Sequence, residues 1–176
     1  EEVAEGIRAG QGEALVVVHD VTHTDDAPER FDAIVDALGG LDLLVYASGV
    51  MPSVEESEYS FAKDQAMVTV NMLGAMAWVH PAAALMEAQR SGTIVGISSI
   101  AGERGRRGNP GYCATKAGFT AWLEGLRNRL TRYGVDVITI KPGFVDTAQF
   151  RSAGITKTPP GLSPITAQAC AARIMQ

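Results

Sequence analysis

The sequence predicts an α/β fold, a doubly wound parallel sheet with helices on its faces. Short runs rich in β-branched residues alternate along the chain with longer segments of helical periodicity. The short runs are continuously apolar, which is typical of strands that are covered on both sides. The connections between them are long enough for right-handed crossovers between parallel strands.

Four segments have the length and composition of strands, at residues 14–19, 41–47, 93–98 and 135–141. Start and stop signals predict helices over about residues 25–38, 61–87 and 111–133, with a kink at Pro81 in the second. The second and third helices are apolar around much of their surface, so we expect them to pack against the sheet or against another subunit. A homodimer or homotetramer is therefore expected.

Composition limits the class of protein. The chain has 176 residues, 46% of them hydrophobic and 20% charged, which is typical of a single globular domain spanning residues 1–176. A net charge of −5 argues against nucleic acid or an anionic membrane as partner. Two isolated cysteines, Cys113 and Cys170, indicate a reducing compartment and no metal site. We found no signal peptide or membrane-spanning stretch and expect a cytoplasmic protein.

The predicted strands end in residues suited to binding. Ligands of open α/β sheets bind beyond the carboxyl ends of the strands, where these ends meet in one crevice. The residues that follow the four strands, in chain order, are Asp20, then Ser48 and Gly49, then Ser99, and finally Pro142 and Gly143.

Ser99, Tyr112 and Lys116 form the strongest chemical pattern. The Tyr-x-x-x-Lys spacing places the phenol and the amine on one face of a helix. A phenol titrates near about pH 10, and a neighbouring ammonium group lowers its pKa toward the working range of an acid–base catalyst. With the Ser99 hydroxyl nearby, the pattern predicts proton transfer to or from an alcohol or carbonyl oxygen.

From residue 20 to about residue 147 the chain resembles the short-chain dehydrogenase/reductases, a family with a Rossmann-like fold. Asn71 in "VNMLGA", Ser99, Tyr112 and Lys116 match the family's catalytic tetrad. Other matched positions, which imply cofactor binding, are Asp20 and Val21, Ala47, Ser48 and Gly49, and Pro142, Gly143, Val145 and Thr147 in "KPGFVDT", together with Tyr112 and Lys116.

The resemblance implies an oxidoreductase that transfers a hydride between NAD or NADP and a small carbonyl or alcohol substrate. Tyr112 would act as general acid or base on the substrate oxygen, and Ser99 would hold that oxygen. Lys116 would lower the pKa of Tyr112 and bind the nicotinamide ribose. Asn71 would anchor a water that relays protons to Lys116.

Two departures from the family pattern keep another function open. Ala47 and Ser48 stand where the family has Asn and Ala, and the Gly-rich loop of a first βαβ unit is expected before Glu1, so the chain looks truncated at both ends. The residue that separates NAD from NADP would lie in that unit. The alternative is a non-catalytic binding or scaffold protein, and a minor option is isomerase or lyase chemistry by Tyr112.

Several residues also have a structural interpretation. Asn71 could satisfy buried backbone groups, Asp20 could brace a loop, and Thr147 could cap a helix. The arginine-rich run at residues 103–107 is favoured as a solvated loop. Its alternative is a site for an anionic group, as in bacterial reductases of polyprenyl-phosphate-linked keto-sugars, to which this segment is weakly similar. Residues 149–164 match the family's mobile substrate loop.

Overall fold

A computed structural model describes residues 2–153, 158 and 163–174. Its centre is a parallel sheet of three strands in the order β1 (Leu43–Tyr46), β2 (Gly92–Ile97) and β3 (Val135–Ile140). The register pairs Val45 with Val95 and Val95 with Ile138, so these side chains share one face of the sheet. Three of the four predicted strands are thereby confirmed, and each ends at the same edge.

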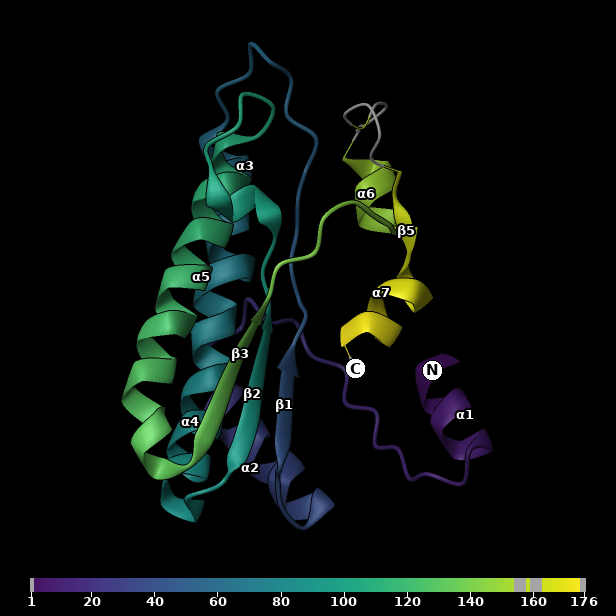
Figure 1. Ribbon diagram of the computed structural model, residues 1–176, viewed down its shortest axis with the longest axis vertical. Coiled ribbons are helices and arrows are strands. Elements are labelled where there is room, and N and C mark those ends of the chain that lie inside the picture. The colour runs from purple at the N-terminus through teal and green to yellow at the C-terminus, as the bar shows by residue number, and fades with distance from the viewer. Residues whose placement is uncertain (1, 154–157, 159–162, 175–176) are drawn as a thin grey trace.

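Helices α4 (Ala75–Gln89) and α5 (Pro110–Leu130) cover one face of this sheet, and α2 (Ala27–Leu38) packs against α4 (Figure 1). The core between helices and strands is apolar and fully buried, because each strand turns alternate side chains to the helices. Its largest members are Val79, Met86, Ile94, Phe119, Leu123, Leu130 and Val135.

The helix ends follow local sequence signals. Gly39 ends α2 with a left-handed φ of 76°, a conformation that glycine adopts without a steric penalty. The Asn109 side chain accepts a hydrogen bond from the backbone N–H of Tyr112 and so caps α5, whose first residue is Pro110. This cap fixes where α5 begins and therefore where Tyr112 lies.

The predicted helix over residues 61–87 is one continuous helix with a change of geometry inside it. It begins as α3 (Phe61–Val68), widens into a π-turn (Thr69–Gly74) and continues as α4 through Pro81. By length and composition alone, Phe61–Gln89 could cross a membrane, and 33% of its most apolar window is buried in this fold. Met67, Val79 and Met86 are fully buried, as in the core helix of a globular domain.

The predicted strand at residues 14–19 is wrong for the part of the chain that the structure describes. This segment follows α1 (Glu2–Ala9) as extended chain without strand pairing, and Val18 is 90% exposed. A strand exists only where its backbone finds a hydrogen-bonded neighbour, and β1 pairs with β2 alone. An apolar sequence run cannot supply that neighbour.

On the second face of the sheet, Leu43, Val45 and Ile138 remain about half exposed. A smaller unit lies on this side across from β1, built from β4 (Val145–Asp146), α6 (Ala148–Ser152), β5 (Ile165–Thr166) and α7 (Ala167–Ile174) (Figure 1). β4 and β5 pair in parallel as a separate two-stranded sheet. The predicted substrate loop begins in α6, while residues 154–157 and 159–162 lie outside the described residues.

Candidate active site

A cavity of about 920 Å³ opens at the carboxyl ends of β1, β2 and β3. It extends between this edge of the sheet and the unit formed by α6 and α7, so the strand ends do meet in one crevice. Nine of the predicted site residues line it, namely Ala47, Gly49, Ser99, Tyr112, Lys116, Pro142, Gly143, Val145 and Thr147. Four do not line it, namely Asp20, Val21, Ser48 and Asn71.

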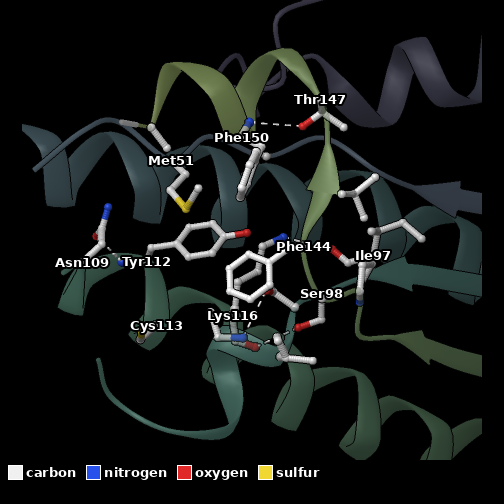
Figure 2. Close-up of a pocket in the computed structure, with 18 of the residues that line it drawn as sticks. Met51, Ile97, Ser98, Asn109, Tyr112, Cys113, Lys116, Phe144, Thr147 and Phe150 are labelled. Atoms are coloured by element: carbon white, nitrogen blue, oxygen red, sulfur yellow. Dashed lines mark hydrogen bonds between the residues drawn. The ribbon is translucent and has the colours of Figure 1, made fainter. Parts of the chain in front are cut away.

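Ser99 and Tyr112 come from different elements, and their side chains are joined by a hydrogen bond. Ser99 is the second residue after β2, and its hydroxyl accepts a hydrogen bond from the N–H of Ala101 at 3.1 Å, which caps the 3₁₀ turn Ile100–Glu103. Tyr112 lies in the first turn of α5 with its ring directed into the cavity (Figure 2). Burial raises the pKa of Tyr112, while a hydrogen bond from Ser99 lowers it and Cys113 raises it further.

Lys116 is buried, with 5% of its surface exposed. Its Nζ donates a hydrogen bond to the Ile97 carbonyl at 2.9 Å and lies 5.8 Å from the centre of the Tyr112 ring. Desolvation lowers the pKa of Lys116 to about 8. The pKa of Tyr112 is raised overall, because burial of the phenol has a larger effect than the hydrogen bond with Ser99. A lowering of the Tyr112 pKa by Lys116 stays a prediction.

The end of β2 is fastened to α5. The Ser98 hydroxyl donates to the Lys116 carbonyl at 3.1 Å and shares a hydrogen bond of 2.7 Å with Thr120. Gly102 lies against the same stretch of helix, since a Cβ there would stand 2.7 Å from the Lys116 carbonyl carbon. These contacts fix the position of Ser99 relative to Tyr112 and Lys116.

Asn71 lies in the π-turn behind the cavity wall and is 1% exposed. Its Oδ1 accepts from the N–H of Val50 at 2.8 Å, and its Nδ2 donates to the Val50 carbonyl and to Thr115 Oγ1, both at 3.1 Å. A Cβ on Gly49 would stand 3.4 Å from Asn71 Oδ1 and 3.5 Å from Lys116 Nζ. Asn71 Oδ1 and Lys116 Nζ therefore both face the side of Gly49 that lacks a side chain, and Asn71 also satisfies buried backbone groups.

Asp20 and Ser48 make contacts within the protein, and Val21 lies beside Gly74 at the end of the π-turn. Asp20 is exposed and accepts a hydrogen bond from the N–H of Thr22 at 2.9 Å, which lowers its pKa. The Ser48 hydroxyl hydrogen-bonds to the Tyr46 hydroxyl. For Asp20 this contact agrees with the structural interpretation as a loop brace, and a role of the three residues in cofactor binding stays a prediction.

Pro142 and Thr147, in the segment after β3, have both structural contacts and a place at the cavity. The Pro142 carbonyl accepts a hydrogen bond from Ile100 at 3.1 Å, which joins the end of β3 to the 3₁₀ turn after Ser99. Thr147 Oγ1 accepts from the N–H of Phe150 at 3.2 Å and so caps α6. Both residues also line the cavity.

Sequence reasoning missed several residues of the site. Apolar side chains from outside the motifs form the walls, including Met51, Phe144, Phe150 and Ile174. Asn109 carried a usable signal, since an asparagine followed by proline is a helix start. Tyr46 and Thr115 carried none, because an aromatic residue at a strand end and a threonine inside a helix are common packing residues.

The arginine-rich run lies at the mouth of the cavity. Arg106 is part of its lining, whereas Arg107 pairs with Glu56 at 3.0 Å, and Glu103 pairs with Lys141 at 2.6 Å. Among the described residues there is no cluster of His, Cys, Asp or Glu able to hold a metal ion.

Many solved structures share this fold. A candidate NAD(P)-dependent gluconate 5-dehydrogenase from Beutenbergia cavernae, with NADP bound at low occupancy, superposes on 98% of this chain and 72% of its own, with a TM-score of 0.86 and 27% identity. ElxO with bound NADP covers 89% of this chain and 67% of its own at a TM-score of 0.80 and 25% identity. NAD+-bound xylitol dehydrogenase covers 84% and 57% at a TM-score of 0.78 and 25% identity.

Sequence relatives agree with the structures. An uncharacterized oxidoreductase of Staphylococcus aureus (strain MW2) is 34% identical over 138 residues, which are 78% of this chain and 60% of the relative. The ketoacyl reductase HetN of Nostoc sp. is 31% identical over 139 residues, 79% of this chain and 48% of its own. The chain thus spans about half to three fifths of these relatives. The model of the short chain dehydrogenase family matches residues 1–157, and the chain belongs to this family.

Proposed function

We propose that this protein is an NAD(P)-dependent oxidoreductase that interconverts a carbonyl group and an alcohol on a small-molecule substrate. The observation that carries the proposal is the convergence of Ser99, Tyr112 and Lys116 on one cavity. Structural neighbours that hold NAD+ or NADP, and relatives named as oxidoreductases, support it.

The residues of the cavity fit the nicotinamide end of a dinucleotide. Lys116 Nζ donates one hydrogen bond to the Ile97 carbonyl, and its two other N–H groups could donate to ribose hydroxyls. Gly49 and Gly143 line the cavity without a side chain, and Pro142, Val145 and Thr147 also belong to its lining. When bound, the nicotinamide would supply or accept the hydride.

Tyr112 is the proposed general acid or base. Because burial raises its pKa, the phenol carries its proton at neutral pH in the free protein, which suits donation to a carbonyl oxygen. Ser99 would hold the same oxygen by a second hydrogen bond. Proton transfer of this kind contributes about 10²–10⁴-fold to a rate.

The experiment that tests the proposal follows NADH and NADPH at 340 nm with a panel of aldehydes and ketones. We expect oxidation of one cofactor by the full-length protein, and a loss of kcat of at least about 100-fold in Tyr112→Phe. Tyr133→Phe is the matched control, since Tyr133 lies at the far end of α5 and does not line the cavity. Unchanged absorbance with every carbonyl, or full activity in Tyr112→Phe, would leave the non-catalytic binding protein as the better proposal.

We also propose a substrate feature, an oligomeric state and a location for this protein. An anionic substrate group would be held by Arg106 at the cavity mouth. A homodimer or homotetramer and a cytoplasmic location are also proposed. Partly exposed apolar residues of the long helix, Phe61, Val68 and Leu73, support contact with a second subunit.

A further inference from the structure

The π-turn Thr69–Gly74 carries Asn71 and interrupts an otherwise regular helix. A π-turn contains one more residue than an α-turn, so a backbone carbonyl leaves the regular hydrogen-bond ladder. Such turns are costly unless another group satisfies the released carbonyl, and they occur frequently at functional sites. The group that maintains this turn therefore controls where Asn71 points.

The Tyr46 hydroxyl binds one carbonyl of this turn. Tyr46 Oη donates a hydrogen bond of 3.0 Å to the carbonyl of Val70, the residue directly before Asn71. Tyr46 closes β1 at the sheet edge that bears the cavity, and only 5% of its surface is exposed. The contact thus joins the rigid sheet to the least regular turn of the helix.

The position of the Tyr46 ring is fixed from two sides. The ring packs edge-on against Phe119 of α5, with a centroid distance of 6.0 Å. Gly74 ends the π-turn just above the hydroxyl, where an added Cβ would stand 3.1 Å from Tyr46 Oη and 2.9 Å from the Val21 carbonyl. Burial raises the pKa of Tyr46 to about 12, so the hydroxyl is a donor at every pH at which the protein would work.

Asn71 is held on its other side by α5. Thr115 Oγ1 accepts a hydrogen bond from Asn71 and donates one of 2.9 Å to the Tyr112 carbonyl. If the π-turn relaxed to α geometry, the register would shift by one residue and turn Asn71 by about 100° around the helix axis. Asn71 would then lose Val50 and Thr115 together.

We infer that Tyr46 is a positioning residue, whose hydroxyl holds the π-turn open through the Val70 carbonyl and thereby keeps Asn71 beside Lys116. This role rests on the proposed function, because it affects turnover only if Asn71 belongs to a working active site. Its effect on the turn itself does not depend on activity.

The test is Tyr46→Phe in the full-length protein, which keeps the ring against Phe119 and removes only the hydroxyl. We expect kcat to fall about 10-fold with KM changed by less than about twofold, since Tyr46 does not line the cavity. In the Asn71→Ala background the same substitution should cause less than about twofold further loss. Tyr133→Phe, which also removes one tyrosine hydroxyl, is expected to keep wild-type values.

Hydrogen exchange gives a readout without turnover. In folded Tyr46→Phe the backbone amides of residues 69–75 should exchange at least about 10-fold faster, while those of β2 and β3 should keep their rates. Gly74→Ala, whose added methyl crowds the Tyr46 hydroxyl, should raise exchange in the same segment. Unchanged exchange in both variants, or losses of kcat that multiply with Asn71→Ala, would overturn the inference. Absence of activity in the wild-type protein would overturn the proposed function, while the exchange result would still decide the role of Tyr46.

Discussion

Lys116 carries an amine that the proposed chemistry needs at the cavity, although burial disfavours its charged form. An ammonium group that is 5% exposed, with no carboxylate among the partners found for it, loses hydration that a single hydrogen bond to Ile97 only partly replaces. Its pKa is lowered to about 8 for this reason. At neutral pH, burying this charged amine at the cavity therefore lowers the stability of the fold.

The cost predicts a pH dependence of stability. Below pH 8 Lys116 is charged in both the folded and the unfolded state, so the full penalty applies. Between pH 8 and the unfolded pKa of 10.5, the folded state releases its proton first, so stability rises with pH. Relative to Lys116→Met, the free energy of unfolding of the wild type should rise by about 2 kcal/mol between pH 7 and pH 10.

Urea denaturation at a series of pH values measures this difference. Tyr112 opposes the trend only above about pH 10, where the unfolded phenol loses its proton before the buried phenol does. Lys63→Met is the matched control, since Lys63 pairs with Glu58 near the surface and leaves Lys116 in place. It should follow the wild-type pH dependence, whereas parallel curves for wild type and Lys116→Met would contradict the prediction.

At the scale of the elements, the site depends on how closely the 3₁₀ turn after Ser99 approaches α5. Gly102 makes the approach possible, since a Cβ there would stand 2.7 to 2.9 Å from backbone atoms of Lys116 and Ala117. Helix backbone cannot move aside as a flexible side chain can. The turn itself would have to shift and would carry Ser99 away from Tyr112.

Gly102→Ala should therefore lower the free energy of unfolding by about 1–3 kcal/mol and reduce kcat. Gly105→Ala is the control, because a Cβ on Gly105 meets nothing within 4 Å. We expect the control to stay within about 0.5 kcal/mol of the wild type. Denaturation curves and rates measured on both variants check this, and equal effects of the two substitutions would refute the role of close packing.

The elements also show what the sequence could predict. Ser99, Tyr112 and Lys116 were expected together because parallel strand ends and helical spacing are local rules with one spatial outcome. The π-turn was not foreseen, since the apolar pattern of residues 61–87 continues through it without a break. The strand expected at residues 14–19 failed for a different reason. Pairing is a property of two segments, and its neighbour could not be read from the run itself.

The pKa shifts of Tyr112 and Lys116 were the other property that the sequence could not predict. The spacing of Tyr112 and Lys116 predicted a phenol with a lowered pKa, but the structure shows both groups shifted chiefly by burial. Burial depends on the whole cavity wall, including Met51, Phe144 and Phe150, which no motif contains. The four-residue spacing predicts that Tyr112 and Lys116 lie close together. Their protonation depends instead on all the elements that bury them.

For the whole molecule, the cavity divides the two parts of the fold. The part with the sheet, α4 and α5 supplies Ser99, Tyr112 and Lys116 to the cavity lining, while the unit with α6 and α7 supplies Phe150, Cys170 and Ile174. The described parts meet across this space with few direct contacts, since β4 and β5 pair only with each other. A ligand in the cavity would therefore touch both parts at once and stabilise their arrangement.

This geometry predicts that the dinucleotide stabilises the whole fold. A ligand that binds only the folded state at 100 times its Kd adds about 2.7 kcal/mol, which in a protein of this size raises Tm by about 5–10 °C. We expect NADH or NADPH to produce this shift in the full-length protein by calorimetry, and the larger shift of the two identifies the preferred cofactor. Lys116→Met should reduce the shift by several degrees because the proposed contacts with the ribose are lost, while Lys63→Met should preserve it. If neither dinucleotide at millimolar concentration changes Tm, the cavity does not bind the cofactor, and the three side chains that meet in it serve another ligand.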